Sequence, residues 1–278
     1  MIGETWENRR ASNRANWDER TSIHLGSSFY DVEGWLRDGR GPRHRELEAL
    51  GDVTGLRLLH LQCHFGLDTL AWARVGAQVT GLDFSPAAVA AAQEIAARAG
   101  LADRAEFVCS DVYQATEALG HANFDVVYMS LGTLCWLPRV DPWAAQIGAL
   151  VAPGGRFYLH DGHPLASALA DDQLKIEYGY FEETEPFVDD SADTYTDGDR
   201  PIAHKRTYEW NHGLGETISA LVRHGLLLEW LDEHDWTSWP RFPWLVQTAD
   251  YTWGTPPGQP RVPLSFSLLA SRADAPRE

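Results

Sequence analysis

Short apolar segments alternate with longer amphipathic ones through the middle of the chain. Apolar runs of about four to eight residues between turns are typical of buried parallel strands, and apolar positions spaced by about 3.6 residues are typical of helices. The pattern predicts strands at residues 58–61, 78–82, 105–110, 124–130 and 156–163. Helices are predicted between them at residues 67–74, 86–100 and 141–152. This alternation indicates an α/β fold in which helices cover both faces of a mostly parallel sheet.

The two ends of the chain follow other patterns. Residues 4–52 mix polar and aromatic residues in three helical segments, without a strand pattern. Residues 164–210 alternate aromatic and acidic residues around a turn, which predicts an antiparallel insertion over the ligand-binding edge of the sheet. The remaining elements are expected to be a helix at 215–225, a strand at 226–235, a Trp- and Pro-rich loop to residue 263 and a last strand at 264–271.

The second predicted strand ends at Asp83. Open α/β sheets bind ligands at the carboxyl ends of their strands, where a carboxylate can accept hydrogen bonds from both hydroxyls of a ribose. A strand-end Asp can instead cap the next helix, but Ser85 followed by Pro86 already supplies that cap. We therefore expect Asp83 to bind an adenosine-containing cofactor.

The charge of the chain narrows the range of partners. Its 278 residues include 23 Lys and Arg against 40 Asp and Glu, a formal net charge of −17. This charge would repel a phosphate backbone, so we expect no nucleic-acid partner. Acidic charge together with many aromatic residues favours a neutral or cationic small molecule as the substrate.

Sorting signals and metal motifs are not evident in the sequence. No apolar run approaches the roughly 18 residues of a membrane span, and the N-terminus lacks the apolar core of a signal peptide. The three scattered cysteines, Cys63, Cys109 and Cys135, fit buried thiols in a reducing cytosol. No metal-ligand spacing occurs. We expect a cytoplasmic protein, a monomer or homodimer, without a metal and without membrane contact.

Three motifs occur in an order that resembles a known family. Residues 81–86 look like an acidic ribose-binding motif, residues 110–112 like an adenine-binding motif, and residues 153–155 like the turn before a fifth strand. Together they resemble the class I S-adenosylmethionine-dependent methyltransferases over residues 55–272, and residues 61–85 are similar to a bacterial small-molecule subgroup with an altered LQCHFG loop. The resemblance implies a Rossmann-like, seven-stranded methyltransferase sheet with an antiparallel last strand. It implies S-adenosylmethionine as the cofactor and S-adenosylhomocysteine as its product.

The first turn departs from the pattern of this family. The family sequence D-L-G-C-G-T-G aligns with residues 60–66, His-Leu-Gln-Cys-His-Phe-Gly, so that only Gly66 is kept. Gln62 and His64 replace glycines that allow the backbone to approach the cofactor closely. Both lie where the methionine end of the cofactor would rest, and either side chain could bond its carboxylate. His60, inside the first strand, is expected to be a core histidine.

The resemblance also implies roles for single residues. Tyr30 resembles an N-terminal tyrosine that closes over the amino-acid end of the cofactor, although ordinary helix packing explains it as well. Asp111 either bonds the adenine amine or forms a turn. The residues expected to contact the cofactor are Tyr30, Gln62, Cys63, His64, Gly66, Asp83, Phe84, Asp111, Val112 and Ser130.

In this family the substrate lies beyond the fifth strand and before the following helix. His163 and His212 lie at these two places, and histidine has a suitable pKa for a general base near neutral pH. The alternative for both is a turn cap. The residues expected to form an aromatic substrate pocket are Trp17, Trp136, Tyr195 and Trp236.

These expectations divide the chain into five parts. They are an N-terminal helical lid (1–54), a cofactor-binding core (55–163), a substrate-cover insertion (164–210), the C-terminal part of the core sheet (211–272) and a tail (273–278). We predict metal-free methyl transfer from S-adenosylmethionine to an oxygen or nitrogen of a small molecule. The alternatives are a catalytically silent relative that binds a ligand and, less favoured because the G-x-G-x-x-G turn is missing, a nicotinamide-dependent oxidoreductase.

Overall fold

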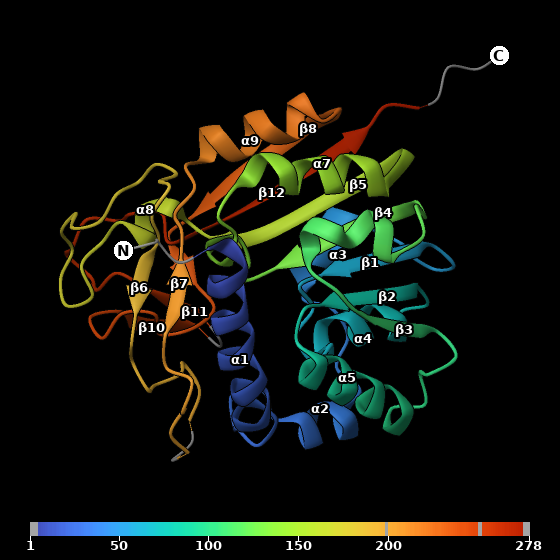
Figure 1. The fold of residues 1–278 in the computed structure, drawn as a ribbon, viewed down its shortest axis with the longest axis horizontal. Helices are drawn as coiled ribbons and strands as arrows, with labels where there is room; N and C mark the ends of the chain where they lie inside the picture. Colours follow the sequence, from blue (N-terminus) through green and yellow to red (C-terminus); the bar gives the residue numbers. More distant parts are fainter. Residues whose placement is uncertain (1–4, 198–199, 250–251, 275–278) are drawn as a thin grey trace.

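A seven-stranded sheet forms the centre of the computed structural model, which describes residues 5–197, 200–249 and 252–274 (Figure 1). The strand order is β3-β2-β1-β4-β5-β12-β8. Neighbours among β1 to β5 are parallel, whereas β12 is antiparallel to both β5 and β8, which confirms the predicted sheet. The bounds are β1 (Arg57–Leu61), β2 (Gln78–Asp83), β3 (Ala105–Cys109), β4 (Phe124–Ser130), β5 (Val151–Gly162), β8 (Leu226–His234) and β12 (Ser265–Arg272).

Strand β1 illustrates why the apolar segments become central strands. Leu58, Leu59 and Leu61 are completely buried. Leu58 packs with Trp72 on one face of the sheet, whereas Leu59 and Leu61 belong to the apolar cluster on the other face. A strand that is apolar on both sides must be covered on both sides.

Helices provide that cover. The helices α3 (His44–Leu50), α4 (Leu67–Arg74) and α5 (Pro86–Arg98) lie on one face, and α6 (Ala115–Ala118), α7 (Val140–Leu150) and α9 (Leu214–Arg223) lie on the other. The predicted cap of α5 is confirmed, because the Ser85 hydroxyl accepts a hydrogen bond of 3.0 Å from the Ala88 N–H. Helix α7 begins at Val140, one residue before the start expected from the sequence, and the Asp141 carboxylate pairs with Arg223 at 2.8 Å.

The N-terminal segment is helical, as predicted. Besides α3 it contains α1 (Trp6–Leu25) and α2 (Val32–Asp38), and α2 ends at Gly39 with a left-handed φ of 66°. Figure 1 shows α1 running across the carboxyl-terminal ends of the large sheet. This is the edge at which the sequence predicts the cofactor.

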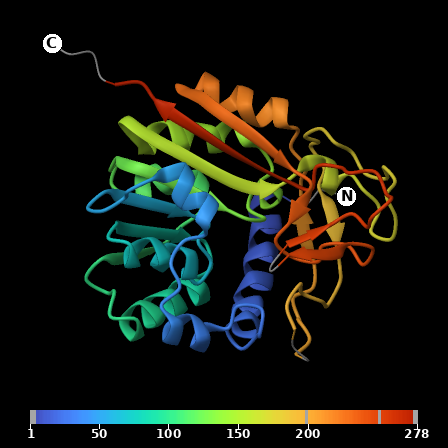
Figure 2. The same ribbon diagram turned by 180° about the vertical axis from the view of Figure 1, so that it is seen from behind.

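Two small antiparallel sheets lie together beyond this edge, as both views show (Figure 2). The insertion contains the short helix α8 (Pro164–Ser167) and the pair β6 (Phe187–Asp189) and β7 (Thr207–Glu209). The segment expected to be a loop up to residue 263 instead contains β9 (Trp236–Thr237), β10 (Val246–Ala249) and β11 (Thr252–Gly254). These strands are too short for a period of two residues to be recognised among Trp, Pro and Gly. Residues 275–278 of the predicted tail and residues 1–4 lie outside the described residues.

Helices α7 and α9 approach each other closely at Gly148. A Cβ atom at this position would lie 2.3 Å from the carbonyl oxygen of His224, a backbone atom that cannot rotate away. Glycine at residue 148 therefore sets the distance between the two helices.

We expect Gly148→Ala to lower the free energy of unfolding by about 1–3 kcal/mol, the usual effect of overpacking. Gly215→Ala, in α9, is the matched control because a Cβ there meets nothing within 4 Å. It should leave stability unchanged or raise it, since alanine favours helix. Urea unfolding of both variants measures the difference, and equal stabilities would contradict this account.

Candidate functional site

The loop after β1 keeps the backbone conformation of a glycine-rich turn without most of the glycines. Gln62, His64 and Gly66 all have positive φ angles, of 54°, 50° and 76°. A left-handed conformation costs an L-residue with a Cβ about 1–2 kcal/mol. Such strain is concentrated at functional sites, where the surrounding structure enforces it. Gln62 and His64 thus hold a left-handed backbone conformation that glycine would adopt without strain.

Gly66 is the position at which a side chain has no room. A Cβ there would lie 2.7 Å from the ring of Phe107 and 3.1 Å from Cβ of Ala92. The glycine that the family pattern keeps is the one that lets α4 and the loop pack against β3 and α5.

Asp83 joins this loop to the end of β2. One carboxylate oxygen accepts a hydrogen bond of 2.8 Å from the His64 N–H, and the other accepts one of 2.9 Å from the Ser85 N–H. The side chain is buried, and burial raises the pKa of Asp83 to about 6, although these hydrogen bonds favour the charged form. A carboxylate has about four lone-pair sites, so both oxygens can still accept a ligand hydroxyl.

The side chain of Gln62 is fixed at one end only. Its Nε2 donates a hydrogen bond of 3.0 Å to the carbonyl of Thr133, while its Oε1 is buried without a partner. A buried acceptor of this kind suits the α-ammonium group of an amino acid. This differs from the predicted contact with the carboxylate.

The rings of His64 and His24 form a neutral pair. His24 Nδ1 lies 3.0 Å from His64 Nε2, and His24 Nε2 lies 2.7 Å from the Thr194 hydroxyl. Burial, helped by the nearby Arg20 guanidinium, lowers the pKa of His24 to about 3, and burial also holds the pKa of His64 well below its usual range. One ring therefore donates to the other, and neither is charged near neutral pH.

The remaining predicted cofactor residues lie along the same edge. Asp111 is a turn residue, since it accepts a hydrogen bond of 2.9 Å from the Tyr113 N–H, and it also pairs with Arg10 at 2.8 Å. The hydroxyl of Ser130 points to Asp68 of α4, at 3.3 Å. Three more residues are buried or half-buried beside the loop ends, namely Cys63, Phe84 and Val112. Burial raises the pKa of the Cys63 thiol, which keeps it protonated.

Helix α1 contacts three of the strand-end loops. Arg10 reaches Asp111 after β3, Asp18 accepts a hydrogen bond of 2.5 Å from the Ser85 hydroxyl after β2, and His24 pairs with His64 after β1. The helix thus covers the predicted adenine, ribose and methionine positions in succession.

Sequence reasoning missed the face of α1 that makes these contacts possible. Asn13, Asn16, Arg20 and His24 are spaced by three or four residues and are all buried. Asn13 makes two hydrogen bonds of 2.8 Å with the backbone of Tyr208 in β7. The signal in the sequence was a long helix whose inward face is polar instead of apolar, which indicates a helix that covers a polar site.

Three of the four predicted pocket aromatics are brought close to the loop. Trp17 lies 5.3 Å from Trp136 and 5.2 Å from His64, between ring centroids. The Tyr195 hydroxyl lies 2.5 Å from that of Tyr30, and both rings contact His24.

Trp236 does not join them. Its ring packs against His234 and His160, at 4.9 and 5.5 Å, and Arg45 lies over it. Within the described ranges no ring contact connects it to the other three, so its predicted place in the pocket is not supported.

The two predicted bases have partners on both ring nitrogens. His163 caps α8, where Nδ1 accepts a hydrogen bond of 3.0 Å from the Leu165 N–H, and its Nε2 lies 2.8 Å from Glu233. His212 contacts the Leu137 carbonyl at 2.7 Å and Glu182 at 3.0 Å. These contacts favour the alternative in which both histidines are structural.

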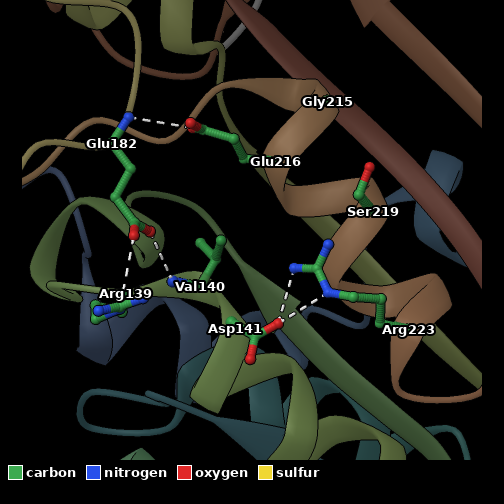
Figure 3. Close-up of a pocket in the computed structure, with 8 residues that line it drawn as sticks. All are labelled: Arg139, Val140, Asp141, Glu182, Gly215, Glu216, Ser219 and Arg223. Carbon is green, nitrogen blue, oxygen red and sulfur yellow. Dashed lines mark hydrogen bonds and ion pairs between the residues drawn. The ribbon is translucent and has the colours of Figure 1, made fainter.

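A surface pocket of about 350 Å³ lies next to Glu182, at the amino ends of α7 and α9 (Figure 3). Its charged groups are paired among themselves, because Arg223 binds Asp141, and Glu182 accepts a hydrogen bond of 3.0 Å from the Val140 N–H. It contains none of the predicted cofactor residues. We do not assign a ligand to it.

The described part of the chain contains neither a metal-binding cluster nor a membrane-spanning helix. No group of three or more His, Cys, Asp or Glu side chains there could hold a metal ion. No helix among the residues described is long and apolar enough to cross a membrane.

The steric requirement at Gly66 gives a test of the loop. We expect Gly66→Ala to lower the free energy of unfolding by about 1–3 kcal/mol more than Gly100→Ala. Gly100 has a similar φ of 69° but open space around it. Gly100→Ala therefore measures the cost of backbone strain without a steric clash. Urea unfolding measures both, and equal losses would mean that Phe107 and Ala92 give way.

The central part of the chain is similar to known proteins. A family model described as a methyltransferase domain matches residues 59–157. A ubiquinone biosynthesis O-methyltransferase of Methylocella silvestris is 35% identical over 138 residues, which cover 48% of this chain and 47% of that protein. The chain therefore spans about half the length of this relative.

Solved structures share the fold at low identity. A putative S-adenosylmethionine-dependent methyltransferase of Listeria monocytogenes has a TM-score of 0.58 and 15% identity, and the match covers 83% of this chain and 97% of that one. A DhpI–SAH complex has a TM-score of 0.55 and 17% identity, with 98% and 100% covered. The family model shows that residues 59–157 form a methyltransferase domain, and the strand order and these structures show that the chain has the fold of S-adenosylmethionine-dependent methyltransferases.

Proposed function

We propose that the protein transfers the methyl group of S-adenosylmethionine to an oxygen or nitrogen of a small molecule and releases S-adenosylhomocysteine. The observation that carries the proposal is the buried Asp83 carboxylate at the end of β2, which is hydrogen-bonded to the left-handed loop after β1. The related ubiquinone biosynthesis O-methyltransferase acts on a small molecule, which supports this substrate class.

Three features of the described residues fit such a cofactor. Asp83 retains lone pairs for the ribose hydroxyls, the buried Gln62 Oε1 lacks a donor, and Asp111 with Val112 follows β3, where the adenine ring is expected. The sulfonium centre of the bound cofactor would supply an already activated methyl group. The task of the protein is then to align the acceptor with it and to exclude water, and alignment contributes roughly 7–11 kcal/mol in favourable cases.

Helix α1 is suited to excluding water, because its polar face contacts the loops after β1, β2 and β3. The cofactor would have to displace some of these contacts on entry. We infer that α1 moves when the cofactor binds, with Arg10 and Asp18 exchanging their partners for solvent or ligand.

The silent-relative alternative was suggested by the missing glycines. The positive φ angles at Gln62 and His64 speak against it, because they are the backbone conformation that glycine residues favour in such a loop. The nicotinamide alternative remains disfavoured by the missing G-x-G-x-x-G turn.

Calorimetric titration with S-adenosylmethionine, S-adenosylhomocysteine and NADH tests the cofactor. We expect micromolar affinity for the two sulfur compounds and none for NADH. Incubation of the protein with radiolabelled S-adenosylmethionine and a panel of hydroxylated and amine metabolites would then reveal the acceptor. If neither sulfur compound binds, the proposal is wrong.

The pKa of Asp83 predicts how affinity depends on pH. Ribose hydroxyls are bound best by the charged carboxylate, which is lost as the pH falls below about 6. We expect S-adenosylhomocysteine to bind about fourfold more weakly at pH 5.5 than at pH 7.5, the fraction lost by one group of that pKa. Asp83→Asn should bind weakly at both pH values without this dependence. A variant that keeps the pH dependence would show that another group titrates.

The contacts of the two histidines predict a structural effect of their removal. We expect His163→Ala and His212→Ala to lower the melting temperature and to reduce affinity for S-adenosylhomocysteine and turnover together, since each ring bridges two elements. Once an acceptor is known, a loss of turnover with unchanged affinity and melting temperature would instead restore the predicted base role.

A further inference from the structure

Arg20 is a buried cation for which no hydrogen-bonding partner is found among the described residues. It lies on the inward face of α1, and only 8% of its surface is exposed. Its Nε is enclosed and has no acceptor, and no ion pair of its guanidinium is found in the part of the chain that the structure describes. Burying an unpaired charge is expensive, and such groups are normally paired or bind a ligand.

Two tryptophan rings lie against the guanidinium group of Arg20. Its Cζ atom lies 5.3 Å from the ring of Trp17 and 5.8 Å from that of Trp136. Aromatic rings stabilise the faces of the cation but do not accept its N–H groups. These donors form a planar fork that matches the two oxygens of a carboxylate.

Arg20 lies between the cofactor loop and the part of the site where the substrate is expected. Trp17 contacts His64 of the loop, while Trp136 follows β4. Glu209 of β7 is an acidic residue whose carboxyl is affected by the charge of Arg20. Burial raises the pKa of Glu209, and Arg241 and Arg20 oppose this, yet Glu209 makes no ion pair with Arg20.

We propose that Arg20 binds the carboxylate of an aromatic methyl acceptor. The proposal rests on the proposed function and deepens it by naming the substrate class. A single carboxylate fits a single guanidinium, and the net charge of −17 disfavours anions of higher charge. The neighbouring tryptophan rings favour an aromatic body. This proposal replaces the expectation of a neutral or cationic substrate, which was based on the net charge.

The test uses a matched pair of probes, 4-fluorobenzoate and 4-fluorobenzamide, which differ in charge but hardly in shape. We expect fluorine NMR titration of the full chain, saturated with S-adenosylhomocysteine, to give at least tenfold tighter binding of the benzoate. Arg20→Gln should abolish this preference, and Arg20→Lys, which keeps the charge but not the fork, should retain part of it. Arg14→Gln, an exposed arginine of the same helix, should bind as the unaltered protein does.

Stability separates a binding role from a structural one. Because no partner of Arg20 is found among the described residues, Arg20→Gln should melt at the same temperature as the unaltered protein or higher. A lower melting temperature together with an unchanged preference for the benzoate would overturn the proposal. So would equal binding of both probes by the unaltered protein.

The cofactor also carries a carboxylate that Arg20 could bind. Two further titrations distinguish the carboxylate of the cofactor from that of the methyl acceptor. Affinities for S-adenosylhomocysteine and 5′-methylthioadenosine, which lacks the amino-acid part, are compared in Arg20→Gln. We expect both to be unchanged. A loss for S-adenosylhomocysteine alone would assign Arg20 to the cofactor and overturn the acceptor proposal. If the unaltered protein binds neither nucleoside but still prefers the benzoate, the proposed function fails while Arg20 remains an anion site.

Discussion

The hydrogen bonds from the backbone of His64 and Ser85 to the Asp83 carboxylate are the contact on which the site depends. They connect the loop after β1, the end of β2 and the start of α5 through one buried side chain. Because the acceptor is charged, each of these bonds is stronger than one between neutral groups. The loop at residues 62–66 is held in its strained path by this carboxylate on one side and by the packing of Gly66 on the other.

Helix α1 depends on a different kind of contact. Its buried face is polar, so its attachment to the core comes from directional hydrogen bonds to loops and to β7 more than from apolar burial. Such contacts can be exchanged for contacts with water or ligand at small net cost. This explains how one helix can cover the site in the structure and still admit a cofactor. The strands and helices of the core, which are held by apolar burial, have no such freedom.

The large sheet could be predicted from the sequence because β1 to β5 are apolar runs separated by recognisable turns. The position of Asp83 at the end of β2 and the Ser85 cap of α5 could also be predicted, because each depends only on neighbouring residues. Prediction from the sequence failed for β9 to β11, since strands of two to four residues carry no period. It also failed for Arg20 and Trp236. Their surroundings depend on how α1 and the small sheets pack onto the edge, and local spacing carries no information about that packing.

The positive φ angles at Gln62 and His64 have a consequence for how this site can diversify. A backbone path that tolerates both glycine and larger residues separates the shape of the loop from its side-chain chemistry. Point substitutions there can add an amide or an imidazole beside the ligand while strand and helix positions stay fixed. In such a loop, the groups that face a ligand can be exchanged while the sheet and helices that hold the loop keep their packing.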